Sequence, residues 1–160
     1  MYSFFSGFED NHSLQMAVIG AEKGNPLVQL WLYYYLDGNN FNFNNLKFIT
    51  NTQIITNIMV ERGLVLNNQI QEIEPNCVIF PKDYFSPKDP GTRLINPSKN
   101  TYTIHHFLAS WVSPNYKLLL RISWGIKRFI YFIENSIGLK THASKPLRSI
   151  YRKLNGKLYE

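Results

Sequence analysis

Two adjacent histidines, followed closely by a serine and a tryptophan, are the side chains in this sequence best suited to chemistry. They are His105, His106, Ser110 and Trp111. Neutral imidazole is a common metal ligand and carries protons near neutral pH, while an indole offers one N–H beside a flat apolar ring. These residues predict a polar binding site. The alternative is a surface or half-buried histidine pair with no such role.

The segment leading to these histidines predicts the element that positions them. In this segment Tyr102 and Ile104 alternate with Thr103 and His105, which is the period of a short strand with one pair on each face. Polar groups at a strand end are where α/β folds place chemistry. Because neighbouring strand residues face opposite sides, only one histidine would point into a cleft, and His106 is favoured as the nearer to Ser110.

Apolar patterning predicts the rest of an α/β domain. The expected strands are 4–8, 65–73 and 77–80, and the expected helices are 27–36, a helix from Thr50 or Asn51 to Gly63, and 117–137. Asn25 is the expected N-cap of the first helix, with Pro26 at its first position. The continuous apolar run 77–80 is typical of a central strand that is covered on both faces.

Length, composition and cysteine content narrow the class of protein to which this chain can belong. A chain of 160 residues with 44% hydrophobic side chains makes about one globular domain and excludes disorder throughout. The single Cys77 excludes an internal disulfide and a cysteine-based zinc cluster. The first residues lack the features of a signal peptide. We therefore expect a cytoplasmic protein, with peripheral attachment to the inner face of the plasma membrane left open.

Basic charge divides the chain into two regions. Residues 1–115 carry 7 Lys and Arg against 9 Asp and Glu, whereas residues 116–160 carry 10 against 2. The tail from 116 predicts a basic amphipathic helix, too often interrupted by Arg and Lys to span a bilayer. Such a helix suits an anionic membrane surface, and a solvated basic face is the equal alternative. Nucleic acid is not expected, because these cations lie on an apolar helix.

Three segments in this order resemble one protein family. They are 20–26 before the first helix, 80–87 after the central strand, and 102–106 with Ser110 and Trp111. Together they look like bacterial sugar-nucleotide glycosyltransferases of the Asp-x-Asp sugar-binding group, similar to capsular and lipopolysaccharide glycosyltransferases and to the yeast initiating mannosyltransferase. The resemblance covers about residues 4–113.

The resemblance implies a GT-A fold, a Rossmann-like mixed sheet with flanking helices that binds a nucleotide-sugar with a divalent metal, Mn²⁺ or Mg²⁺. It places His106 at the metal. The donor diphosphate would lie against His105, Ser110 and Trp111, and the acceptor sugar against Asp83 and Tyr84. For Asp83 and Tyr84, ordinary packing is an equally good interpretation.

One departure from the family is large. No Asp-x-Asp occurs in the sequence, and Glu72-Ile73-Glu74 has the spacing but lies in an expected strand. We therefore expect residues 1–115 to be the C-terminal half of such a transferase, needing the missing N-terminal half as a partner and inactive alone. The expected acceptor is a glycan or a lipid-linked sugar in surface polysaccharide synthesis. The alternative function is a non-catalytic module that binds a membrane surface through residues 116–160.

Overall fold

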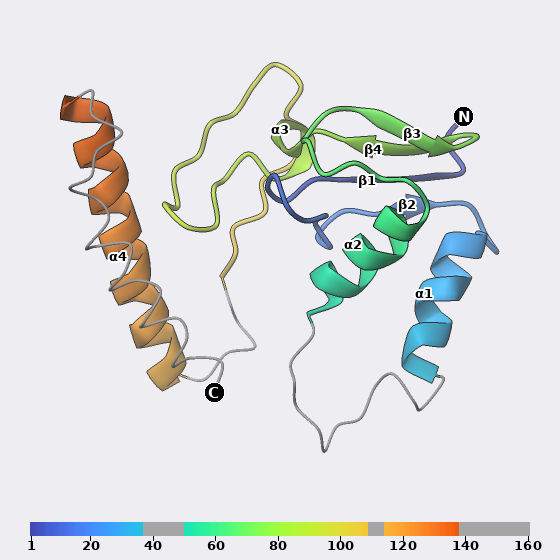
Figure 1. Ribbon diagram of the computed structural model, residues 1–160, viewed down its shortest axis with the longest axis horizontal. Coiled ribbons are helices and arrows are strands. Elements are labelled where there is room, and N and C mark those ends of the chain that lie inside the picture. The colour runs from blue at the N-terminus through green and yellow to red at the C-terminus, as the bar shows by residue number, and fades with distance from the viewer. Residues whose placement is uncertain (37–49, 109–113, 138–160) are drawn as a thin grey trace. The chain divides into compact units, whose positions relative to one another are not determined.

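The computed structural model describes residues 1–36, 50–108 and 114–137 (Figure 1). The chain forms two compact units. The first comprises residues 1–87 and 96–105, and the second comprises residues 88–95 and 106–160. Each unit is described below by itself.

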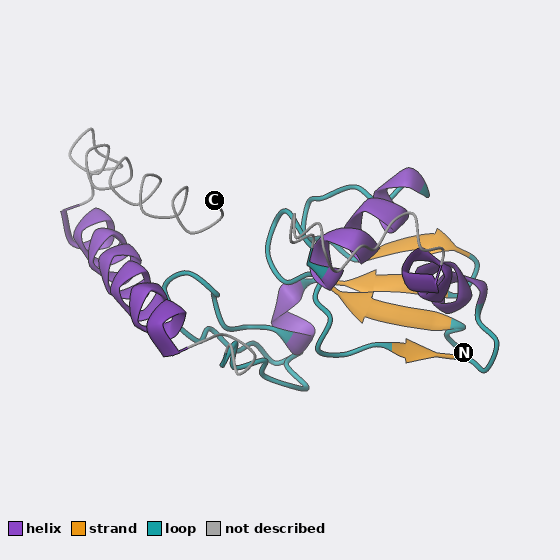
Figure 2. Ribbon diagram, turned by 90° about the horizontal axis from the view of Figure 1, so that it is seen from below, coloured by secondary structure: helices purple, strands orange, loops and turns teal. Residues whose placement is uncertain are grey.

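A four-stranded mixed sheet forms the centre of the first unit (Figure 2). Its strands are β1 (Phe4–Gly7), β2 (Gly20–Ala21), β3 (Gln71–Glu74) and β4 (Cys77–Phe80). The spatial order is β2-β1-β4-β3, in which only β1 and β4 are parallel. The α/β class is therefore confirmed. The central position predicted for 77–80 is also confirmed, because β4 has a neighbour on each side.

Helices α1 (Pro26–Leu36) and α2 (Asn51–Glu61) cover one face of this sheet, as Figure 2 shows. Strand residues that point to this face pack with residues of both helices. The buried core cluster consists of Phe4, Phe8, Leu14, Leu27, Ile55, Met59, Leu64, Cys77 and Ile79. Burial of each large side chain contributes about 1.5–3 kcal/mol, so this layer supplies most of the unit's hydrophobic stabilisation.

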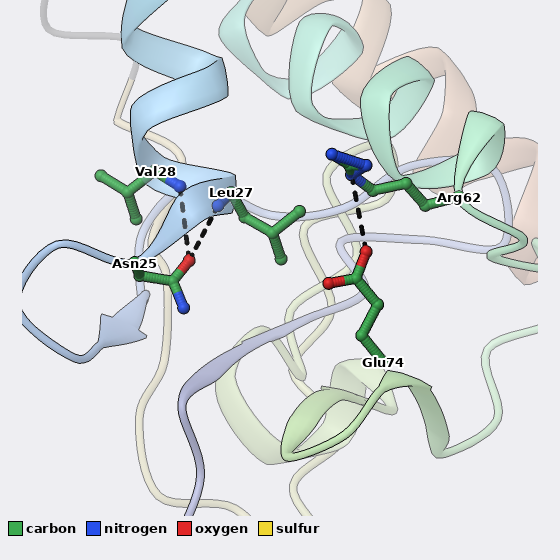
Figure 3. Close-up of polar contacts among 5 residues, drawn as sticks. All are labelled: Asn25, Leu27, Val28, Arg62 and Glu74. Carbon is green, nitrogen blue, oxygen red and sulfur yellow. Dashed lines mark hydrogen bonds and ion pairs between the residues drawn. The ribbon is translucent and has the colours of Figure 1, made fainter.

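The helix boundaries follow the predicted capping residues. The Asn25 side-chain oxygen accepts a hydrogen bond from the Leu27 backbone N–H at 3.0 Å, with Pro26 at the first helical position (Figure 3). At α2, the Thr50 hydroxyl accepts from the Gln53 N–H at 3.2 Å. These oxygens satisfy N–H groups that have no partner within the helix, which is why both helices begin there.

An aromatic cluster covers the opposite face of the sheet. Phe5 and Phe80 alternate away from the helices and meet with ring centroids 6.4 Å apart. The one-turn helix α3 (Lys82–Phe85) adds Phe85, whose ring lies 6.0 Å from that of Phe5. A Cβ on Gly7 would lie only 2.8 Å from the Phe85 ring, so the glycine permits this close approach. The sheet is thus covered on both faces.

The strand expected over 65–73 is wrong for most of its length. Only Gln71–Glu74 pairs as β3. The Gln71 side chain donates to the Val65 carbonyl at 2.8 Å and accepts from the Val65 N–H at 2.9 Å, which closes residues 65–71 into a loop. Asn68 lies in this loop with a φ of 56°, a conformation that extended strands do not adopt.

The strand expected over 102–105 is also wrong. Residues 101–108 have no regular secondary structure. The Tyr102 N–H donates to the Tyr84 carbonyl at 2.8 Å, and the Thr103 hydroxyl donates to the Phe85 carbonyl at 3.0 Å. These donors bind the end of α3 instead of a neighbouring strand. Because residues 102–105 are not a strand, strand alternation does not decide which histidine faces a cleft.

In the second unit, the long helix α4 (Pro114–Ile137) confirms the expected helix and begins three residues earlier. The segment 88–95 folds back on itself through a bridge between Lys88 and Ile95. The Arg93 guanidinium lies 4.2 Å from the centre of the Trp124 ring, which joins this segment to α4. None of the described helices is long and apolar enough to cross a membrane.

Candidate functional site at the carboxyl edge of the sheet

The carboxyl ends of β1 and β4 bring chain segments that lie far apart in the sequence to one edge of the sheet. Because the two strands are parallel, with Gly7 opposite Phe80, both leave the sheet on the same side. The Phe8 N–H still donates to the Phe80 carbonyl at 2.9 Å. Glu9 lies two residues after the end of β1, and Lys82 opens α3 two residues after the end of β4. Open α/β sheets bind ligands at this kind of edge.

Glu9 is the most perturbed carboxyl group at this edge. Burial and, to a lesser extent, the neighbouring negative charge of Asp10 raise the pKa of Glu9 to about 7. A tight loop holds the position, because the Glu9 N–H donates to the Ser13 carbonyl at 2.9 Å. Asp10 accepts from the Ser13 hydroxyl at 2.9 Å. Near neutral pH Glu9 is present in both protonation states, as proton transfer requires.

Sequence reasoning missed Glu9. The only signal was its place immediately after a buried strand, and a pattern of residue types does not report how deeply a carboxyl group is buried. The physical cause of its pKa is the packing around it, which the sheet and its covering layers create together.

Asp83 and Tyr84 hold the loop that leads to the histidines. The Asp83 carboxylate accepts from the Ser98 hydroxyl at 2.6 Å, and its backbone carbonyl accepts from the Thr101 hydroxyl at 2.7 Å. The Tyr84 ring stacks on Phe80 with centroids 4.9 Å apart. Both residues thus have packing roles at the predicted edge. Their contact with an acceptor sugar stays a prediction.

The histidines differ in their surroundings. His105 is half-buried at the end of the first unit, and it follows the segment that α3 binds. His106 is exposed and belongs to the second unit. Ser110 and Trp111 lie outside the described residues. Hydrogen bonds from residues 101–103 to carbonyls of α3 thus hold the segment that precedes His105, and the roles predicted for the four residues stay predictions.

Arg93 fixes the backbone around His106 within the second unit. Its guanidinium donates to the His106 carbonyl at 2.7 Å and to the Phe107 carbonyl at 2.9 Å while it lies over Trp124. Burial lowers the pKa of Arg93 from its ordinary value. Two charge-assisted hydrogen bonds from one planar group hold the two carbonyls in a fixed geometry. Sequence reasoning missed this residue as well.

The described residues do not assemble a metal site by themselves. Within residues 1–36, 50–108 and 114–137, no three His, Cys, Asp or Glu side chains gather closely enough to hold a metal ion. Divalent metals need several oxygen or nitrogen ligands, and one exposed imidazole at His106 supplies only one. The ligand role of His106 stays a prediction.

A hollow lies at the opposite edge of the sheet. It has a volume of about 300 Å³ and is lined near the amino ends of β1 and β4 by residues that include Ser3, Glu22, Lys23 and Cys77. Burial and, to a lesser extent, the charge of Glu74 raise the pKa of the Cys77 thiol to about 11. A thiol with that pKa is a poor nucleophile, so Cys77 acts as an apolar core residue.

Comparison with known proteins does not assign this chain to a family. No protein-family model, no curated protein and no solved structure matches the chain.

Proposed function

We propose that this chain supplies one half of the substrate site of a sugar-nucleotide glycosyltransferase of the GT-A type. The complete enzyme transfers a sugar to a glycan or lipid-linked acceptor in bacterial surface polysaccharide synthesis, in the cytoplasm. The observation that carries the proposal is the shared carboxyl edge of β1 and β4. It gathers Glu9, α3 and the segment that leads to His105.

Glu9 at this edge, together with Ser110 and Trp111 as predicted from the sequence, would supply the groups that sugar transfer requires. The acceptor hydroxyl attacks the anomeric carbon, the bond from that carbon to the diphosphate breaks, and the hydroxyl proton must pass to a base. Glu9, with a pKa of about 7, is the described carboxyl group best suited to take that proton. The Ser110 hydroxyl and the Trp111 indole N–H would donate to the diphosphate oxygens, on which negative charge develops.

The missing Asp-x-Asp motif belongs to the same proposal. A divalent metal stabilises the leaving diphosphate when it is bound, and the sequence contains no Asp-x-Asp to hold one. The partner is then a polypeptide that contributes these aspartates. The chain alone would orient the sugar and the acceptor without catalysing transfer.

The test is release of nucleoside diphosphate from a panel of uridine and guanosine diphosphate sugars with Mn²⁺ and a short oligosaccharide acceptor. The chain is assayed alone and together with a polypeptide that carries an Asp-x-Asp segment encoded next to its gene. We expect turnover only in the mixture. Equal, robust turnover by the chain alone would show that it is no half-site, and no turnover with any donor in the mixture would overturn the transferase proposal.

Single substitutions in the active mixture then test the edge. Glu9→Gln and Trp111→Ala should each lower kcat by about 100-fold, within the range of one general base or one transition-state donor. Glu22→Gln and Tyr33→Ala are the matched controls, because Glu22 lies at the opposite edge and Tyr33 is exposed on α1. Equal losses in the controls would show that the site lies elsewhere.

A further inference from the structure

The helix α4 leaves a continuous apolar strip exposed. Leu118, Ile122, Phe129 and Phe132 are 60%, 50%, 58% and 68% exposed. Residues spaced four, seven or eleven positions apart lie on one side of an α-helix, since each residue advances about 100°. Four large apolar side chains thus lie along one side of a helix and remain in contact with water. We call this strip the apolar face of α4.

A basic side chain lies one position before each of three residues of the apolar face. Lys117, Arg121 and Arg128 precede Leu118, Ile122 and Phe129, so they form a parallel row about 100° around the helix. Arg121 and Arg128 are exposed. The helix contains one acidic residue, Glu134, which lies about 120° from Ile122 on the side away from that row. Cations therefore border the apolar face on one side and the acidic residue is turned away from it.

The side of α4 that packs is a different one. Ser123 and Ile130 are buried, and the Trp124 ring carries the Arg93 guanidinium. A Cβ on Gly91 would lie 2.9 Å from Cδ of Lys127, so the segment 88–95 approaches the helix there. Among the described residues of the second unit, segment 88–95 thus packs against the side of Trp124 and Lys127, and none of them covers the apolar face.

We propose that the apolar face of α4 docks onto an anionic lipid bilayer, with the helix lying parallel to the surface. Apolar side chains that enter the acyl boundary, bordered by cations at the level of the headgroups, are what this mode of binding requires. The segment after α4 adds charge of the same sign, because residues 138–160 carry six Lys and Arg and one acidic residue. The proposal does not depend on the glycosyltransferase proposal.

Charge and residue type favour a bilayer over other partners. A nucleic acid would be held by the cations but would leave Leu118, Ile122 and Phe129 in water. A second copy of the chain would cover the apolar face but would bring two rows of like charge together. An anionic bilayer, with its apolar interior, accommodates the apolar face and the basic row at once.

The test is co-sedimentation of the full chain with vesicles of phosphatidylcholine alone and of phosphatidylcholine mixed with phosphatidylglycerol. We expect binding to the anionic vesicles and little to the neutral ones. Ile122→Glu/Phe129→Glu should lower the partition coefficient at least tenfold. Arg121→Gln/Arg128→Gln should lower it roughly 30-fold on anionic vesicles, about fivefold for each cation removed.

The matched control adds the same two negative charges outside α4. Gln29→Glu/Asn57→Glu changes exposed residues of α1 and α2 and should leave binding within about twofold of the wild type. Circular dichroism on every variant confirms that α4 is still helical. Binding that survives Ile122→Glu/Phe129→Glu, or that falls equally in the control, would overturn the proposal.

Two further outcomes would assign the face to another partner. A dimer in light scattering that Ile122→Glu/Phe129→Glu dissociates, without any vesicle binding, would identify a second copy of the chain as the occupant. Binding to a labelled oligonucleotide that Arg121→Gln/Arg128→Gln abolishes, again without vesicle binding, would identify nucleic acid. Either result overturns the bilayer proposal.

Discussion

The helices α2 and α4 are both amphipathic, yet they place their apolar residues in opposite environments. In α2 the residues Ile55 and Met59 are buried in the core cluster that the helix forms with the sheet. In α4 the residues Ile122 and Phe129 are at least half exposed. The same kind of sequence pattern therefore stabilises the first unit in one case and presents an apolar surface in the other. An apolar stripe shows that a helix has a face to cover, but it does not show what covers it.

The largest difference should come from truncating one isoleucine in each helix. Ile55→Ala should lower the free energy of unfolding by about 2–5 kcal/mol, because Ile55 is 2% exposed and its loss leaves a cavity. Ile122→Ala should change it by less than about 0.5 kcal/mol, because half of that side chain is already in water. Urea unfolding followed by circular dichroism measures both. Equal losses would mean that the apolar face of α4 is covered.

The next effect concerns the buried carboxyl group at the sheet edge. The pKa of Glu9 rises from 4.5 to about 7 on folding, so the folded state holds its proton more tightly. Below about pH 4.5 Glu9 is protonated in both the folded and the unfolded state, and its burial costs no stability. As the pH rises to about 7, the unfolded state loses this proton first, and the folded state becomes less stable relative to it. Glu9→Gln should raise the free energy of unfolding at pH 8 by up to about 3 kcal/mol and leave it unchanged near pH 4.

Unfolding experiments across this pH range provide the check on Glu9. The control is the exposed, uncharged Gln29 of α1, and Gln29→Ala should show no such dependence on pH. A Glu9→Gln difference that is constant from pH 4 to pH 8 would contradict the proposed burial of Glu9.

A smaller effect should follow from removing the cap of α1. Asn25→Ala removes the oxygen that accepts from Leu27 and the amide that donates to the Ser3 carbonyl at 3.1 Å. We expect a loss of about 1–2 kcal/mol in thermal or urea unfolding. Asn25→Asp restores the acceptor but not the donor, so it should recover about half. No recovery would mean that the cap does not contribute.

The smallest effect should come from the ion pair between α2 and β3. The Arg62 Nε and the Glu74 Oε1 lie 3.7 Å apart, with side chains 33% and 48% exposed (Figure 3). Water screens such a pair, so a double-mutant cycle of Arg62→Ala and Glu74→Ala should give a coupling energy below about 0.5 kcal/mol. A coupling energy above 1 kcal/mol in that cycle would show that α2 is held to the sheet by charge as well as by apolar packing.

Local signals predicted the elements whose causes are local. The N-caps Asn25 and Thr50 act on N–H groups two or three residues away, and the end of α2 needs only Gly63 with a φ of 97°. The continuous apolar run 77–80 predicted a central strand, because a strand covered on both faces has no polar side to show. These features are readable because a short stretch of sequence contains their whole cause.

The histidine segment shows why the rest was not readable. Residues 102–105 have the alternation of a strand, but the carbonyls of Tyr84 and Phe85 accept from Tyr102 and Thr103. A period of two describes the side chains of a segment and does not show which backbone groups lie beside it. The expected strand failed for that reason, and the position of the segment at the end of α3 was not predicted from the sequence.

The sequence by itself determined the α/β class, the two capped helices, the central strand and the concentration of basic charge after residue 115. Each follows from residue type and period. Tertiary structure alone decided that Glu9 is buried enough to titrate near neutral pH, that Arg93 holds the backbone at His106, and that the apolar face of α4 stays in water. Burial depends on which distant segments come together, and that is a property of the folded chain.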